Sequence, residues 1–92
     1  MSSEQFEKGQ KIRREIVGDD RVDQWMGESD PMLKALEEVT TEIAWGSIWS
    51  RPGLPAKTRS LITVALLAAQ NRPEELEAHL ITAQRNEWLR QL

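Results

Sequence analysis

A short loop with two prolines and a glycine separates two apolar helical patterns in the middle of the chain. Arg51 precedes Pro52, and a residue before proline is disfavoured in the α region, so the helix before the loop must end there. Pro55 restricts the other end of the loop, because a proline ring fixes its own φ. Any fold of this chain must therefore accommodate a stiff bend over residues 51–55.

Apolar residues recur at helical spacing in four segments, and no convincing strand can be drawn. The first segment runs over about residues 3–17, and Gly18 offers a stop. The acidic stretch that follows, residues 19–29, predicts only one turn of helix, around Val22, Trp25 and Met26.

The second helix begins at a clear signal. Asp30 is a natural N-cap, and Pro31 fits the first helical position because its missing N–H would have no partner there. The apolar residues that follow have the spacing of one helical face: Met32, Leu36, Val39 and Ile43. This pattern continues through Trp45, Ile48 and Trp49.

The third helix opens at Pro55 and is apolar on every side over residues 61–69. A helix without a polar face is buried all round. We therefore predict that it forms the central post of the fold or the middle of a subunit interface. Residues 71–73 break it, and a fourth helix begins at Pro73 with glutamates in its first turn, where the helix dipole favours acids.

The chain has 92 residues and no cysteine, so one domain over residues 1–92 is expected and disulfides are excluded. A domain of this size buries only about 60–65% of its unfolded surface, which makes a solitary monomer marginal. Oligomerisation is therefore the expected source of additional stability.

The net charge of −3 and the pI of about 5.2 disfavour a general nucleic-acid binder. The longest apolar run is too short to span a bilayer. A polar N-terminus of mixed charge carries no secretory signal, so a soluble cytoplasmic protein is expected. His79 is the only histidine, and a metal site built on it would be unusual, so no metal is expected.

Glu42, Trp45 and Trp49 share one helical stripe. Both tryptophans can be core residues, or they can line a pocket for a small organic anion. Gly46 between them lets another backbone or a ligand come close. A carboxylate on this stripe must be paired or neutral when buried, so Glu42 is either ion-paired with an arginine or held as an uncharged acid.

Cationic side chains flank the bend. Lys57 and Arg59 fall in the first turn of the third helix, where cations oppose the helix dipole, and Arg51 lies on the other side of the loop. A helix N-terminus with added cations is a ready site for a carboxylate. Alternatively, Arg59 forms an ion pair with Glu42 or with an acid of residues 19–28, and the two roles can coexist.

His79 lies within the apolar stripe of the fourth helix. It can be a core histidine hydrogen-bonded to a backbone or hydroxyl group. It can also be a general acid or base, because imidazole titrates near neutral pH. Glu75, one turn earlier, could orient the ring or could be a solvated acid near the helix start.

One stretch resembles the signature of the γ-carboxymuconolactone decarboxylase family: Ala44-Trp45-Gly46-Ser47-Ile48-Trp49-Ser50-Arg51-Pro52-Gly53-Leu54-Pro55, followed by Lys57-Thr58-Arg59-Ser60-Leu61. His79 and its neighbours Glu74, Glu75, Leu76, Ala83 and Asn86 resemble the next helix of that family. The resemblance runs from near the N-terminus to about Asn86. The family usually continues with a further pair of helical segments that do not follow here.

The resemblance implies an all-α fold of the alkylhydroperoxidase-D-like type, assembled as a trimer or hexamer with pockets near subunit contacts. It implies cofactor-free decarboxylation of 4-carboxymuconolactone to the β-ketoadipate enol-lactone. In that reaction His79 and Glu42 would be catalytic, and substrate would be bound by Arg51, Arg59, Trp45 and Trp49. The alternative is a catalytically inactive, shortened relative that acts as a helical assembly module.

Overall fold

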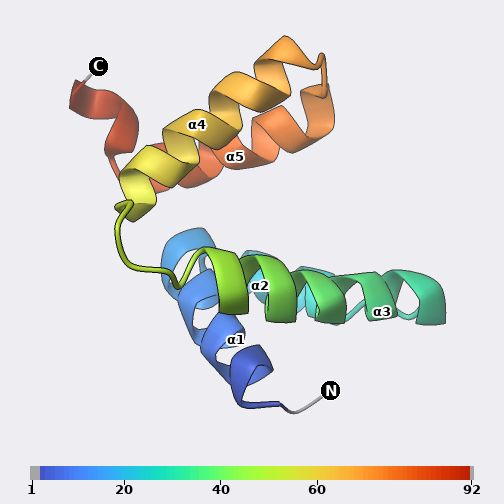
Figure 1. The fold of residues 1–92 in the computed structure, drawn as a ribbon. Helices are drawn as coiled ribbons and strands as arrows, with labels where there is room; N and C mark the ends of the chain where they lie inside the picture. Colours follow the sequence, from blue (N-terminus) through green and yellow to red (C-terminus); the bar gives the residue numbers. More distant parts are fainter. Residues whose placement is uncertain (1–2, 92) are drawn as a thin grey trace. The chain divides into compact units, whose positions relative to one another are not determined.

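The computed structural model describes residues 3–91, and every regular element in that range is a helix (Figure 1). The predicted all-α fold is therefore confirmed. Contacts divide the chain into two compact units, Met1–Arg51 and Pro52–Leu92, here called unit 1 and unit 2. The boundary falls at the predicted proline loop. A single domain over residues 1–92 stays a prediction.

Unit 1 begins with α1, Glu4–Val17, whose N-cap is Ser3: the Phe6 N–H donates to the Ser3 hydroxyl oxygen at 3.0 Å. Gly18 ends α1 as predicted, with a φ of 106° that favours glycine. The next element, α2, Asp19–Met26, has eight residues, so the prediction of a single helical turn was wrong. Two acids in its first turn and the fully buried Val22 stabilise it.

The helix α3, Pro31–Val39, starts where the sequence predicts. The Asp30 carboxylate accepts hydrogen bonds from the N–H groups of Met32 and Leu33 at 2.9 and 3.3 Å. The chain then continues as η1, Thr40–Ile48, a nine-residue π-helix. This wider helix was not predicted. Helices of this type are rare in proteins, and those that occur are often found at functional sites.

The helices α1 and η1 approach each other at two glycines. A Cβ atom at Gly9 would collide with the carbonyl oxygen of Thr41, and one at Gly46 would collide with the carbonyl oxygen of Gln5. Gly46 therefore admits the backbone of α1, which was one of the two predicted possibilities. This close approach places Trp45 in the core of unit 1, where it is buried with Val17 and Val22.

One apolar face of α3 and η1 remains exposed. Met32, Leu36, Val39 and Ile43 have the spacing of a face that packs, yet Met32 is 77% exposed and the other three are exposed as well. The same helices bury Thr41 and Trp45 instead. The spacing identified a real apolar face, but α1 covers a different one.

Unit 2 is built on α4, Ala56–Ala69, and α5, Pro73–Arg85, which pack together (Figure 1). The predicted break between them is confirmed. Asn71 takes the left-handed conformation, with a φ of 56°, and the Arg72 N–H donates to the Leu67 carbonyl oxygen at 3.0 Å. These are features of a Schellman cap. A short 3-10 helix, η2, Trp88–Gln91, follows α5.

The prediction that the third helix is the central post of the fold is wrong for this chain. Ser60 is buried, but Ile62 and Leu66 of α4 are exposed. The physical reason is that α5 is the principal partner of α4 within unit 2, and one helix covers only one side of another. The other predicted role, a subunit interface, stays a prediction.

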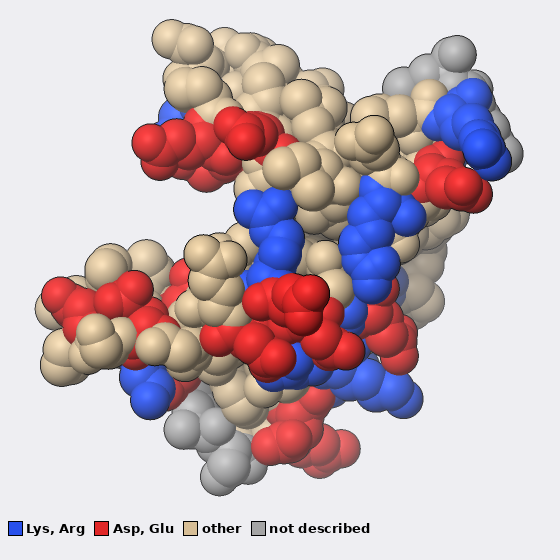
Figure 2. Space-filling view, turned by 180° about the vertical axis from the view of Figure 1, so that it is seen from behind, with Lys and Arg blue, Asp and Glu red and all other residues tan. Residues whose placement is uncertain are grey.

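Acidic and basic side chains lie interspersed on the face drawn in Figure 2. In unit 1, for example, Arg14 forms ion pairs with Asp19 at 3.2 Å and with Asp23 at 2.8 Å. None of the helices within residues 3–91 combines the length and apolarity needed to cross a bilayer.

Candidate functional site

The indole ring of Trp45 in η1 stacks on the ring of Trp49, the residue that directly follows η1. Their ring centroids are 4.5 Å apart and the planes differ by 27°. Trp45 is only 6% exposed, whereas Trp49 is partly buried at the edge of the core cluster. Trp45 is thus a core residue, and Trp49 is the ring of the pair with more surface available to a ligand.

Glu42 lies on the same π-helix and is half-buried. Its carboxylate accepts a hydrogen bond from the Ser3 hydroxyl at 2.8 Å. Ser3 is also the N-cap of α1, so this bond ties η1 to the first turn of α1. The partner of this carboxylate is therefore a serine hydroxyl, whereas an arginine was one of the two predicted possibilities.

Two of the predicted cations lie on either side of the loop. Arg51 follows η1 and is exposed. Arg59 lies in α4, is half-buried, and donates from Nε to the Leu54 carbonyl oxygen at 3.3 Å. Lys57 is half-buried in the first turn of the same helix, as predicted. Positive charge therefore gathers at the N-terminus of α4.

His79 lies on α5 and is half-buried. Burial lowers the pKa of its imidazole below the ordinary value of 6.5, because desolvation disfavours the charged ring. Glu75 forms an ion pair with Arg72, with 2.7 Å between its carboxylate and Nε. This contact favours the surface role for Glu75 over a role in orienting the imidazole.

The six predicted site residues are divided between the two units. Trp45 and Trp49 touch, and Glu42 and Arg51 belong to the same unit. Arg59 and His79 belong to unit 2. Convergence of all six on one pocket stays a prediction.

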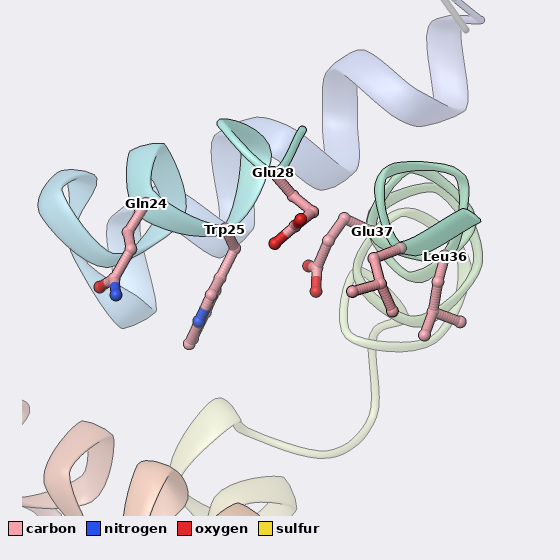
Figure 3. A pocket seen from close by; sticks show the side chains of 6 residues that line it. Gln24, Trp25, Glu28, Leu36 and Glu37 are labelled. Carbon is pink, nitrogen blue, oxygen red and sulfur yellow. The ribbon is translucent and has the colours of Figure 1, made fainter. Parts of the chain in front are cut away.

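A cavity of about 200 Å³ in unit 1 lies between α2 and α3 (Figure 3). Figure 3 shows the carboxylates of Glu28 and Glu37 pointing toward each other across it, beside Trp25. A second cavity, of about 430 Å³, is lined in unit 2 by Gln84, Glu87, Leu89 and Arg90. None of the six predicted residues lines either one. Among residues 3–91, no group of three or more His, Asp or Glu side chains is placed to hold a metal ion.

Arg13 is a residue that the sequence patterns did not single out. It is 5% exposed and contacts Trp25, Glu37 and Thr41. The available signal was its position: an arginine on the otherwise apolar face of the first helix must be paired if that face is buried.

Residues 34–90, more than half of the chain, match the carboxymuconolactone decarboxylase family. The chain belongs to this family. All six predicted site residues lie within the matched range. The predicted resemblance is therefore confirmed at the level of the family.

Two curated relatives are decarboxylases by name. The chain is 38% identical over 81 residues to the 4-carboxymuconolactone decarboxylase of Acinetobacter baylyi, covering 87% of this chain and 60% of that protein. It is 38% identical over 74 residues to the nitrosuccinic acid decarboxylase of Metarhizium robertsii, covering 80% of this chain and 52% of that protein. The chain thus spans between half and two thirds of the length of these relatives. No solved structure matches it.

Proposed function

We propose that this chain acts as a decarboxylase and that its substrate is 4-carboxymuconolactone, which loses CO₂ to give the β-ketoadipate enol-lactone. The observation that carries this proposal is the 38% identity to a 4-carboxymuconolactone decarboxylase over 87% of the chain. The second relative, named for a different acid, supports decarboxylation as the general activity.

The proposed reaction breaks one carbon–carbon bond. The electron pair released with CO₂ moves through the conjugated double bond onto the lactone carbonyl, and a proton is then returned to carbon. The substrate is its own electron sink, so the reaction needs no cofactor. The protein has to bind one carboxylate, desolvate the other, and deliver the proton.

The tryptophan stack suits the desolvating wall. Trp49 offers the more exposed ring, and the buried Trp45 supports it from behind. A carboxylate against an apolar wall is poorly solvated, which favours its loss as neutral CO₂. Arg51 and Arg59 suit the remaining carboxylate, since guanidinium groups bind carboxylates in a bidentate geometry.

We assign the proton transfer to His79, because an imidazole titrates near neutral pH. Burial lowers the pKa of its imidazole, so the charged ring is a stronger acid but a less populated one at neutral pH. The Glu42 carboxylate accepts a hydrogen bond from the Ser3 hydroxyl. Glu42 remains the alternative donor.

We also propose that the chain is a cytoplasmic homo-oligomer, a trimer or hexamer as in the family it resembles. Two exposed apolar surfaces support assembly: Met32, Leu36, Val39 and Ile43 in unit 1, and Ile62 and Leu66 in unit 2. Such surfaces on a soluble protein mark sites of protein association. They also support the competing function, a helical assembly module without activity.

One experiment separates the two functions. The conjugated chromophore of 4-carboxymuconolactone disappears on turnover, so its ultraviolet absorbance is followed with the purified chain while size-exclusion chromatography gives the oligomeric state. We expect loss of absorbance from an assembled species. An assembled species that leaves the absorbance unchanged would support the assembly module instead.

A further inference from the structure

A single buried side chain, that of Arg13 in α1, contacts all three other elements of unit 1. Its guanidinium carbon lies 4.7 Å from the ring centroid of Trp25 in α2. One terminal nitrogen is 2.9 Å from the Glu37 carboxylate in α3. The other donates to the Thr41 hydroxyl in η1 at 3.1 Å. Arg13 is therefore placed to fix how these elements pack.

Two of these contacts lie where α3 changes into the π-helix η1. The Glu37 carbonyl oxygen accepts from the Thr40 N–H and also from the Thr41 hydroxyl, the latter at 2.8 Å. A threonine hydroxyl that bonds back to a carbonyl four residues earlier perturbs a helix locally. Arg13 holds that hydroxyl with one nitrogen and the Glu37 carboxylate with the other. Hydrogen bonds therefore connect Arg13, Glu37 and Thr41 at the first turn of η1.

This network connects to the tryptophan stack. Thr41 lies four residues before Trp45 on η1, and Trp25 packs against the cluster that contains Trp45. Trp45 in turn stacks on Trp49. The turn that contains Thr41 therefore leads directly into the segment that carries both indoles.

The burial of the Arg13 guanidinium is not explained by stability alone. Arg13 is 5% exposed, and its Nε has no hydrogen-bond partner within residues 3–91. Replacing a buried ion pair by well-packed apolar residues is often neutral or stabilising. A retained buried charge can instead specify one structure among several, here the π-helix in place of a continued α-helix.

We propose that Arg13 is a positioning residue that sets the π-helical register of η1 and so holds Trp49 stacked on Trp45. The part of this inference that concerns substrate, namely that the stack is a wall of the substrate pocket, rests on the proposed function. The structural part does not.

The test uses the circular dichroism of the stacked indoles. Two indole rings this close couple their electronic transitions, and the difference between the spectra of the wild type and Trp49→Phe isolates that couplet. We compare the couplet in Arg13→Met, which removes the charge, and in Thr41→Val, which is nearly isosteric and removes the hydroxyl. Arg14→Met is the matched control, since Arg14 is the neighbouring arginine and pairs with Asp19 and Asp23 at the surface.

We expect the Trp49-dependent couplet to be lost in Arg13→Met and in Thr41→Val and to be retained in Arg14→Met. If Arg13→Met does not fold, Thr41→Val decides. A couplet of full amplitude in Thr41→Val, or equal loss in Arg14→Met, would overturn the proposal.

Turnover is measured on the same variants. Misplacement of the wall by about 1 Å should lower kcat by up to about 10²-fold. If the wild type shows no turnover, the proposed function is wrong. The circular dichroism couplet still tests the structural role of Arg13 in that case.

Discussion

The two units bury different kinds of side chain. Unit 1 buries Val17, Val22 and Trp45 around the paired charge of Arg13. In the described part of unit 2, the buried residues are small: Ser60, Thr82 and Ala83. Small side chains let α4 and α5 approach closely, but they remove little apolar surface from water.

The two units therefore differ in how well their own contacts can stabilise them. Unit 1 has a core of its own, held by contacts between four helical elements. Unit 2 leaves Ile62, Leu66, Leu80 and Ile81 exposed, and a helical pair of this size rarely supplies enough burial alone. The stacked tryptophans belong to unit 1, and the only histidine of the chain belongs to unit 2. A substitution at His79 should therefore affect chemistry, whereas a substitution at the contact of α1 with η1 should affect stability.

The largest expected effect is on turnover. His79→Ala should lower kcat by roughly 10²–10⁴-fold, the usual contribution of a positioned general acid. The rate is measured from the loss of the lactone chromophore. Glu75→Ala is the matched control one turn away, because Glu75 is ion-paired with Arg72 at the surface, and it should keep near wild-type turnover. Unchanged turnover in His79→Ala would remove the imidazole from the mechanism and leave Glu42 as the donor.

The next effect is on the stability of unit 1. Gly9→Ala would place a methyl group against the Thr41 carbonyl oxygen, where backbone rather than a flexible side chain must yield. We expect a loss of about 1–3 kcal/mol in the free energy of unfolding, as for other overpacked cores. Urea denaturation followed by tryptophan fluorescence measures it.

Gly27→Ala is the control for this substitution. Gly27 is exposed, has an ordinary φ of −83°, and an added Cβ would lie 3.1 Å from the Asp23 carbonyl oxygen. The loss in this variant should be clearly smaller. Equal losses in the two variants would mean that α1 and η1 separate readily, and that unit 1 does not depend on their close contact.

The helix boundaries were predictable because each is decided within a few residues, by a capping hydrogen bond or by the φ that proline restricts and glycine permits. Asp30 with Pro31, and the prolines at residues 55 and 73, mark helix starts in the sequence and in the structure. Gly18 marks an end for the same reason. The π-helix was not predictable, since it depends on Thr41 and on the contact of Thr41 with Arg13, 28 residues away.

Burial was harder to predict than helicity. Periodicity shows that Met32, Leu36, Val39 and Ile43 share a face, but it does not show what covers that face. The candidate site residues show the same limit: their local spacing was predictable, but their long-range contacts were not. Spacing alone predicted that Trp45 and Trp49 are neighbours, whereas the bond from Ser3 to Glu42 joins residues 39 positions apart. Contacts over such distances depend on how helices pack, and a single sequence does not encode them locally.

The smallest expected effect is a pH dependence of stability that originates in unit 2. Burial lowers the pKa of His79 in the folded chain, so the unfolded chain, with a pKa of about 6.5, takes up its proton at a higher pH. Stability from this group is fully present above about pH 6.5 and falls as the pH decreases from there through the folded pKa. The urea midpoint of the wild type should therefore decrease slightly on the acid side of neutrality.

His79→Gln should lack this component, because no other histidine is present and the substitution changes no carboxylate. Gly9→Ala should keep it, since that substitution lies in unit 1. Identical pH dependence in the wild type and His79→Gln would mean that the imidazole is as well solvated in the folded chain as in the unfolded one. In that case the burial of His79 would not distinguish its imidazole from a surface histidine, and the role proposed for it would lose its structural support.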